Sequence, residues 1–307
     1  MTHTQVGIVF NPSKIQRSAL EAALTDAGAP DPAHWFETTP DDPGQGPARD
    51  ALAAGCDLVI VAGGDGTVRA VAEVLVGTGT ALGIVPQGTG NLLARNLGVP
   101  LNGPKAALRR IAEAEPRPID VGWIETDDGK RRAFVVMVGI GLDAHMLAET
   151  DDDLKSKAGW LAYVEALGRA VAASEVIDLT IAIDGGHAQE VTAHTVLVGN
   201  CGALQGGVTL LPDAAFDDGL LDLLAISSEG IAQWADTLRS MVWDNGILRL
   251  FVRDKKATST GTVEHAQARE VRVELPEPRA FEIDGEEAGE VRAFTATIEA
   301  GALLVRA

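Results

Sequence analysis

Two glycine-rich turns are the residues of this chain best suited to binding a phosphate group. The first is Gly63-Gly64-Asp65-Gly66-Thr67, after the apolar run 58–61, and the second is Gly88-Thr89-Gly90-Asn91. Apolar residues at helical spacing follow the first turn, from Val68 to Val76. A turn between a strand and a helix directs backbone N–H groups and the positive end of the helix dipole toward one point. The two turns therefore predict a phosphate-binding site.

Asp65 is an unusual residue for a phosphate-binding turn, because its negative charge would repel a bare phosphate. A carboxylate is useful there if a metal ion or a substrate hydroxyl lies beside the phosphate. The alternative is that Asp65 only forms the turn or caps the helix. Two such turns, one with an Asp and both with a Thr, favour the chemical role.

Two acidic stretches occur in the second half of the chain. Residues 211–222 hold four Asp around a glycine, and carboxylates with turn carbonyls are ligands that Mg²⁺ and Ca²⁺ prefer. An exposed acidic turn explains this stretch equally well. In residues 281–287, Asp284 and Glu286 are two positions apart and share one face of an extended chain. Local sequence alone favours an ordinary hairpin turn at that point.

The first 120 residues alternate between strand-like and helix-like segments. We predict strands at 6–10, 34–39, 58–61 and 83–86, with helices at 15–27, 48–55, 68–76 and from 92. Such alternation indicates a mostly parallel sheet with helices on both faces, which binds ligands at the carboxyl ends of its strands. The polar residues that directly follow these strands should converge at one edge, namely Asn11, Thr39, Asp65 and Thr89.

The pattern changes after Pro118, where consecutive strands are separated by hairpin turns. Strand signals at 119–124 and 133–138 are followed by others near 177–184, 190–199, 220–226, 248–253, 257–263, 269–275, 279–284 and 295–298, with helices at 154–174 and 229–244. This favours an antiparallel, sandwich-like second domain. We expect domains at 1–122 and 123–289, with a tail of about 290–307 that returns to the first domain. The cleft between them is the expected active site.

Composition narrows the classes of function. The 307 residues carry 25 Lys+Arg against 44 Asp+Glu, a net charge of −19, which argues against nucleic acid as a partner. No apolar run approaches the ~20 residues of a membrane span, and the N-terminus lacks a signal-peptide pattern. Two cysteines, Cys56 and Cys201, are too few for a disulfide scaffold. The negative charge also argues against strong attraction of the whole molecule to an anionic membrane. We expect a cytoplasmic protein, and the sequence leaves open whether it forms a homodimer.

Together these motifs resemble the diacylglycerol kinase catalytic-domain family, which includes bacterial lipid kinases and sphingosine kinases. The resemblance rests on GGDGT at 63–67, P-x-GTGN at 86–91 with Ala94-Arg95 after it, and Ile283-Asp284-Gly285-Glu286. NAD kinases and phosphofructokinases also carry GGDG-type turns, but the GTGN turn and the late Asp-Gly-Glu fit them less well. The resemblance implies a Rossmann-like α/β domain, similar to phosphofructokinase and NAD kinase, followed by an antiparallel β-sandwich.

The resemblance also implies a function and roles for residues. It implies ATP- and Mg²⁺-dependent phosphorylation of a lipid hydroxyl, of diacylglycerol or a related lipid, with Asp284 as general base. Glu286 would lie near the nucleotide, and Asp65 would help to hold the catalytic metal or the hydroxyl. The other residues implied for ATP binding are Asn11, Pro12, Thr39, Gly63, Gly64, Gly66, Thr67, Gly88, Thr89, Gly90, Asn91 and Arg95. Lys14 is a further candidate on its own chemistry, because its ammonium group could reach a phosphate from the strand-to-helix junction. A structural Mg²⁺ would be held by Asp218 and the carbonyls of Ala215 and Leu220, with Asp120 connected through water.

Three positions depart from the family pattern. The usual NP-x-x-G start is replaced by Asn11-Pro12-Ser13-Lys14, and Leu92 stands where many bacterial members have Asp. Either Thr38 or Thr39 could be the threonine that contacts the nucleotide in this family. The alternatives to a diacylglycerol kinase are a kinase of sphingosine or another small alcohol, and a nucleotide-binding regulatory protein without turnover.

Overall fold

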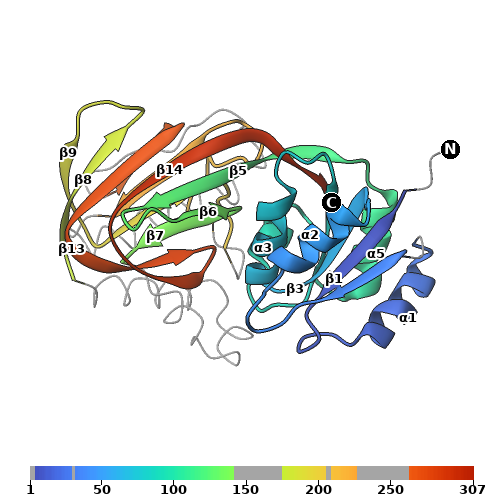
Figure 1. The fold of residues 1–307 in the computed structure, drawn as a ribbon. Coiled ribbons are helices and arrows are strands. Elements are labelled where there is room, and N and C mark those ends of the chain that lie inside the picture. Colours follow the sequence, from blue (N-terminus) through green and yellow to red (C-terminus); the bar gives the residue numbers. More distant parts are fainter. Residues whose placement is uncertain (1–3, 30–31, 142–174, 205–208, 227–262) are drawn as a thin grey trace, which may run out of the picture.

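The computed structural model describes residues 4–29, 32–141, 175–204, 209–226 and 263–307. Several predicted features lie outside these residues: the helices at 154–174 and 229–244, the strands at 248–253 and most of 257–263, and the apolar side chains Leu142, Met146 and Leu147. In the described residues, an α/β half and a β-rich half lie side by side (Figure 1). The predicted fold class is confirmed.

The α/β half is built on a parallel sheet with the strand order β4-β3-β1-β2. Its elements are β1 (Val6–Phe10), α1 (Arg17–Ala27), β2 (His34–Glu37), α2 (Gln45–Ala53), β3 (Leu58–Gly63), α3 (Asp65–Leu75), β4 (Ala81–Pro86), α4 (Leu92–Asn96) and α5 (Pro104–Glu113). Every residue of β1, β3 and β4 is buried, because α1 packs with α5, and α2 with α3, over the sheet. Continuous apolar runs are expected in strands that are covered on both faces.

The β-rich half is antiparallel. Its strands are β5 (Arg117–Thr126), β6 (Arg131–Phe134), β7 (Met137–Ile140), β8 (Ile177–Ile183), β9 (Gln189–Ala193), β10 (Thr195–Gly199), β11 (Leu221–Ile226), β12 (Val263–Ala268), β13 (Glu270–Ile283) and β14 (Glu286–Arg306). On β13, Val271, Val273 and Leu275 point into a second apolar core, while the residues between them are exposed. This alternation is typical of a sheet with one solvated face.

The boundaries of some strands differ from the sequence prediction. The segments 269–275 and 279–284 are one strand, β13, whose pairing with β14 shifts register between Glu274 and Arg279. Pro276 and Pro278 lie at this shift, and proline lacks the N–H that a ladder needs, so it interrupts pairing without ending the strand. Likewise, 295–298 is only a part of the 21-residue β14.

β14 joins the two halves of the molecule. Its first part pairs with β13 and β5, and Leu304–Arg306 then pairs in parallel with β4 of the α/β half. In Figure 1, β5 and β14 run together from one half to the other, and the C-terminus lies beside the α/β sheet. A continuous hydrogen-bonded ladder therefore sets how the two halves sit relative to each other.

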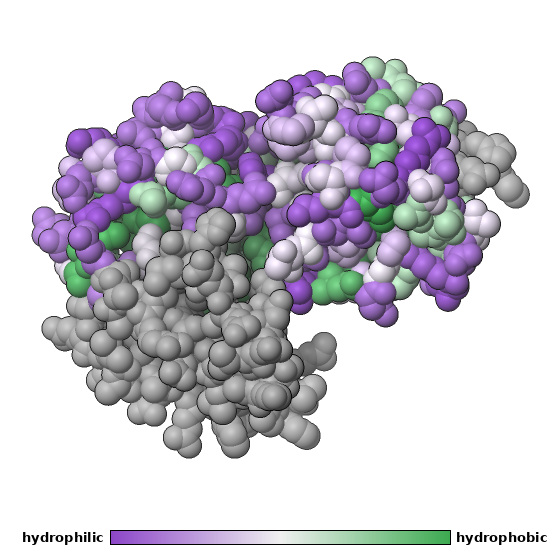
Figure 2. All heavy atoms as spheres, turned by 90° about the horizontal axis from the view of Figure 1, so that it is seen from below, coloured by the Kyte–Doolittle hydropathy of each residue, from purple (hydrophilic) through white to green (hydrophobic). Residues whose placement is uncertain are grey.

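The described residues are mainly hydrophilic on the face seen in Figure 2. The exposed large apolar side chains on the described residues are Leu101 and Val176. None of the helices in the described part of the chain has the length and apolar character needed to cross a bilayer.

Candidate functional site

The two glycine turns are joined by the carboxylate of Asp65. This residue starts α3, and its Oδ2 accepts the N–H of Asn91 at 2.8 Å while its Oδ1 accepts the N–H of Leu92 at 2.6 Å. Burial raises the pKa of Asp65, the two N–H bonds oppose that rise, and the nearby charge of Glu286 adds to it. Asp65 therefore ties the turn after β3 to the turn after β4.

The second turn is closed by its own asparagine. The side-chain oxygen of Asn91 accepts the N–H of Gly88 at 2.8 Å, and its amide nitrogen donates to the Gly88 carbonyl at 2.7 Å. Asn91 adopts a left-handed conformation with φ of 48°, which Asn tolerates better than most residues. The Nε of Arg95 donates to the Gly90 carbonyl at 2.6 Å, so Arg95 supports the turn from α4.

The two turns approach each other backbone to backbone. A Cβ atom on Gly88 would lie 2.7 Å from the Cα of Gly64, and one on Gly90 would lie 2.8 Å from Asp65 Oδ2. Within the described residues, no side-chain hydrogen bond from the N-cap position closes the start of α3, whose first N–H groups have no acceptor inside the helix. This arrangement fits an anionic phosphate at the helix end.

The Asp-Gly-Glu segment forms the hairpin turn between β13 and β14. Asp284 and Gly285 have φ of 51° and 79°, and Ile283 pairs with Glu286, which is the geometry of a two-residue type I′ turn. The turn reaches across to α3 and α4, because a Cβ on Gly66 of α3 would overlap the Glu286 carboxylate and one on Gly285 would lie 3.6 Å from Leu92 of α4. Arg69 of α3 forms an ion pair with Glu286, with 3.1 Å between Nη2 and Oε2.

The carboxylate of Asp284 is buried and points at a backbone segment between β6 and β7. Its Oδ2 accepts the N–H of Val135 at 3.0 Å, and its Oδ1 accepts those of Val136 and Met137 at 2.8 and 3.0 Å. Two carboxylate oxygens have about four acceptor positions, so three N–H bonds leave room for one more donor. Burial raises the pKa of Asp284 to about 6, although Arg69 and these N–H bonds lower it.

The other predicted nucleotide residues lie near the strand ends of the α/β half. The N–H of Asn11 donates to the carbonyl of Ala62 at 3.0 Å, which places Asn11 beside the first glycine turn. Pro12 and Lys14 lie in the turn that follows β1, where Lys14 is exposed. Thr38 is buried at the end of β2, whereas Thr39 is exposed and forms a local turn with Asp42. Thr67 is buried and Thr89 is exposed.

The predicted structural metal loop lies at a different place, between β5 and β14. Asp120 is buried and accepts the N–H of Gly219 at 2.6 Å and that of Gly301 at 2.7 Å. Asp218 accepts the N–H of Leu220 at 3.0 Å, and burial, followed by the charges of Asp120 and Asp217, raises its pKa. Both oxygens of Asp120 are engaged, so it holds the loop in place.

A cavity of about 600 Å³ opens beside this loop, lined in part by Asp120, Asp217, Asp218 and Arg269. In the described part of the chain, no group of three or more His, Cys, Asp or Glu side chains is arranged to hold a metal. A metal here would therefore depend on Asp218 and on backbone carbonyls such as those of Ala215 and Leu220.

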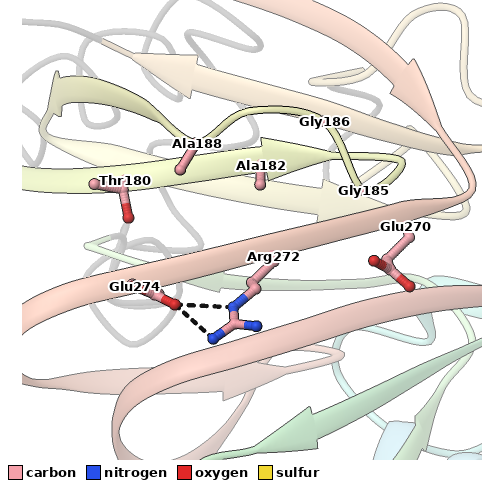
Figure 3. A pocket seen from close by; sticks show the side chains of 8 residues that line it. All are labelled: Thr180, Ala182, Gly185, Gly186, Ala188, Glu270, Arg272 and Glu274. Atoms are coloured by element: carbon pink, nitrogen blue, oxygen red, sulfur yellow. Dashed lines mark hydrogen bonds and ion pairs between the residues drawn. The ribbon is translucent and has the colours of Figure 1, made fainter.

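Another cavity, of about 320 Å³, lies on the solvated face of β8 and β13 (Figure 3). The guanidinium of Arg272 is turned to Glu274, with Nη2 2.6 Å from Oε1, so the cation in this cavity is already paired. This cavity includes none of the predicted site residues.

Sequence reasoning missed two parts of the site. Arg69 follows Asp65 by four residues, so both lie on the same side of α3, and this spacing could have indicated the role of Arg69. The N–H groups of 135–137 had no such signal, because backbone donors leave no mark on residue type. Only the packing of β6 and β7 against the β13–β14 turn brings them to Asp284.

Comparison with known proteins agrees with this geometry. The diacylglycerol kinase catalytic domain family matches residues 9–124, which contain both glycine turns. The YegS C-terminal NAD kinase beta sandwich-like domain family matches residues 135–307, more than half of the chain and the part that contains Asp284 and Glu286. The chain belongs to the diacylglycerol kinase family. The predicted family resemblance is thereby confirmed.

Individual relatives extend this result. A "Diacylglycerol kinase" of Mycobacterium tuberculosis H37Rv is 33% identical over 58% of this chain and 58% of its own length. A "Probable lipid kinase YegS-like" protein of Pseudomonas aeruginosa PAO1 is 37% identical over 67% of this chain and 66% of its own length. A crystal structure from Bacillus anthracis str. Sterne, provisionally described as a diacylglycerol kinase, is 28% identical with a TM-score of 0.72, covering 98% of this chain and 94% of that one. The alignment thus spans little more than half of the Mycobacterium relative.

Proposed function

We propose that this protein is a lipid kinase that transfers the γ-phosphoryl group of ATP to the hydroxyl of diacylglycerol or a related lipid. The observation that carries the proposal is the meeting of the Asp284–Glu286 turn with the glycine turns at the start of α3. Phosphoryl transfer needs a phosphate cradle and a proton acceptor held next to each other. The names of the Mycobacterium and Pseudomonas relatives support the lipid as acceptor.

The first half supplies the phosphate cradle. Glycines at 64 and 88 allow two backbones to come together, and the uncapped start of α3 offers N–H donors and the positive end of a helix dipole. Such fixed donors stabilise charge on the transferring group without having to reorganise. Asn11, directly after β1, lies beside the first turn, and Arg95 of α4 supports the second turn.

The second half supplies the base. In this mechanism the free acceptor position of Asp284 takes the proton of the lipid hydroxyl as the oxygen attacks the γ-phosphorus and the bond to ADP breaks. A pKa of about 6 suits that role, because the group is ionised at neutral pH and still basic enough to accept a proton. Three N–H bonds hold the carboxylate in one orientation.

Mg²⁺ would neutralise the negative charge of the β- and γ-phosphates when bound. The residues that would hold it are Glu286, which is half-exposed above α3, and Asp65 beside it. The lipid acceptor implies transient contact with a membrane surface, and we propose that the protein acts from the cytoplasm.

The decisive experiment is phosphate transfer from γ-labelled ATP with Mg²⁺ to a panel of acceptors in mixed micelles. The panel holds diacylglycerol, sphingosine and short-chain alcohols, with one reaction that lacks any acceptor. We expect labelled phosphatidic acid to form fastest. Faster labelling of sphingosine or of a small alcohol would favour the alternative kinases. ATP binding without transfer to any acceptor would make the protein a nucleotide-binding regulator.

We also propose that Asp218, with the carbonyls of Ala215 and Leu220, holds a structural Mg²⁺, and that Asp120 holds the loop that supplies them. Replacing Asp218 by Ala should lower the melting temperature in Mg²⁺ and abolish the difference between Mg²⁺ and chelator that the wild type shows. Thermal unfolding followed by circular dichroism measures both. Asp217→Ala, in the same exposed loop, is the matched control and should keep the Mg²⁺ effect. Equal melting curves of the wild type with Mg²⁺ and with chelator would exclude the metal.

A further inference from the structure

Asn96, the last residue of α4, binds the backbone of Ala203 with both ends of its side-chain amide. Its Nδ2 donates to the Ala203 carbonyl at 2.9 Å, and its Oδ1 accepts the Ala203 N–H at 3.0 Å. A side-chain amide is suited to this double contact because it carries a donor and an acceptor side by side. Ala203 lies 107 positions later in the chain, so the contact connects two distant segments.

On its other side, Asn96 is tied to the second glycine turn. α4 has only five residues, and its first residue, Leu92, donates its N–H to Asp65 Oδ1 at 2.6 Å. The Nδ2 of Asn96 also donates to the carbonyl of Leu92 at 2.9 Å. The Nε of Arg95 holds the Gly90 carbonyl of the turn itself. One short helical turn therefore separates the predicted phosphate site from the Asn96 amide.

The segment that leads to this contact lies against the backbone that orients the proposed base. The carbonyl of Val136 accepts the N–H of Asn200 at 2.8 Å and that of Cys201 at 3.1 Å. The carbonyl of Val135 accepts the Nδ2 of Asn200 at 3.3 Å. The N–H groups of Val135 and Val136 are in turn two of the three that bind the carboxylate of Asp284. Hydrogen bonds therefore run without a break from the second glycine turn to the base.

Packing fixes this connecting segment in place. Asn200 and Cys201 are fully buried, and Cys201 belongs to the apolar core of the α/β half together with residues 135–137. Gly202 lies so close to Leu211 that a Cβ atom would overlap the Leu211 carbonyl. Protein interiors have few voids into which a shifted backbone could move. A displacement at Ala203 is therefore passed on to the backbone at 135–137.

We infer that Asn96 is a positioning residue for phosphoryl transfer: by holding Ala203, it fixes the glycine turn that binds the phosphates relative to the backbone that holds Asp284. The inference rests on the proposed function. Asn96 acts through Ala203, as a second connection between the halves besides the β14 ladder. Transfer requires the hydroxyl, its base and the γ-phosphorus in near-attack geometry, and a misplacement of about 1 Å costs up to about 100-fold in rate.

The inference predicts that kcat and ATP affinity respond differently to a change at Asn96. Asn96→Ala removes the contact with Ala203 and should lower kcat by about 10- to 100-fold at saturating ATP and lipid. The Kd for ATP with Mg²⁺ should stay close to that of the wild type, because the second turn is closed by Asn91 and tied to Asp65 independently of Asn96. Kinetics with the best lipid acceptor and calorimetric titration with ATP measure the two quantities.

Two further variants make the comparison specific. Asn96→Asp keeps the acceptor for the Ala203 N–H but turns a carboxylate toward the carbonyls of Ala203 and Leu92, so it should be impaired like Asn96→Ala. Asn102→Ala replaces an exposed asparagine in the loop before α5 and should behave as the wild type. An unchanged kcat in Asn96→Ala, or a loss of ATP affinity with an unchanged kcat, would overturn the inference.

Amide hydrogen exchange separates this inference from the proposed function, because it needs no turnover. In Asn96→Ala we expect roughly 10-fold faster exchange at Asn200, at Cys201 and at the N–H groups of 135–137 that bind Asp284, as in a local opening. Exchange in β1 and β3 should stay at the wild-type rate.

The exchange pattern decides the outcome. Wild-type exchange at 135–137 in Asn96→Ala, or faster exchange throughout β1 and β3 as well, would reduce Asn96 to a purely structural residue and overturn the inference. The expected pattern in a protein that transfers no phosphate to any acceptor would refute the proposed function alone, and it would support the hold of Asn96 on the backbone around Asp284.

Discussion

Replacing Asp284 by Asn should abolish most of the turnover while the protein still folds. The amide cannot accept the proton of the attacking hydroxyl, and the loss of a general base typically lowers rates by about 10²- to 10⁴-fold. Asn tolerates the positive φ of the β13–β14 turn, and its side-chain oxygen can keep the bonds from Val136 and Met137, whereas its amide nitrogen cannot accept the N–H of Val135. The measurement is kcat with saturating ATP and lipid, next to a thermal melt of each variant.

The pH dependence of stability checks the environment of Asp284 independently. Its pKa is raised from 3.8 to about 6 in the folded protein, so the folded state holds the proton more tightly than the unfolded chain. The stabilisation that this provides is complete below about pH 4 and is lost as the pH rises through about 6. Asp284→Asn should lack this part of the pH dependence.

An exposed aspartate provides the control for both measurements. Asp178 on β8 is exposed and accepts a hydrogen bond from Thr192. Asp178→Asn should leave turnover unchanged. If Asp284→Asn kept a rate near that of the wild type, the assignment of the base would be wrong, and the buried carboxylate would have only a structural role.

Replacing Gly88 by Ala should weaken ATP binding by about 100-fold or more. The new Cβ would lie 2.7 Å from the Cα of Gly64, and a backbone atom cannot rotate away as a side chain could. The two turns would have to separate, which breaks the bonds from Asn91 and Leu92 to Asp65. A loss of about 3 kcal/mol corresponds to that change in Kd, and calorimetric titration with ATP and Mg²⁺ measures it.

Two other glycines make this test specific. A Cβ on Gly64 would lie 3.4 Å from the Cα of Gly88, an ordinary contact, so Gly64→Ala should weaken binding much less. Gly28→Ala, at the end of α1 with φ of 65° and open space around it, should cost stability without changing the Kd for ATP. Equal affinity of Gly88→Ala and the wild type would show that the turns do not bind the phosphates.

The phosphate-binding half of the site was predictable from the sequence to a large extent. Apolar runs, glycine turns and helical spacing are local patterns, and the parallel arrangement brings the ends of adjacent strands to one edge. The pair formed by Gly64 and Gly88 follows from that arrangement, because β3 and β4 are neighbours in the sheet. Glycine is needed at position 88 because a Cβ atom there would collide with the neighbouring backbone.

The second acidic centre was only partly predictable. Local sequence identified a turn at Asp284 but could not say what the buried carboxylate faces, since its partners are backbone N–H groups 147 to 149 residues earlier. Two prolines also made one long strand look like two. These contacts depend on which strands become neighbours, and residue type does not encode that choice locally.

The sequence by itself determined the family, the two glycine turns and the identity of the carboxylates, because each of these is specified by particular residue types only a few positions apart. The tertiary structure alone decided that Arg69 meets Glu286 and that Asp284 is buried on the 135–137 backbone. The physical reason is the β14 ladder, which pairs with β13, β5 and β4 and so sets how the acidic turn lies against α3. Pairing over such long sequence distances depends on the folding of the whole chain.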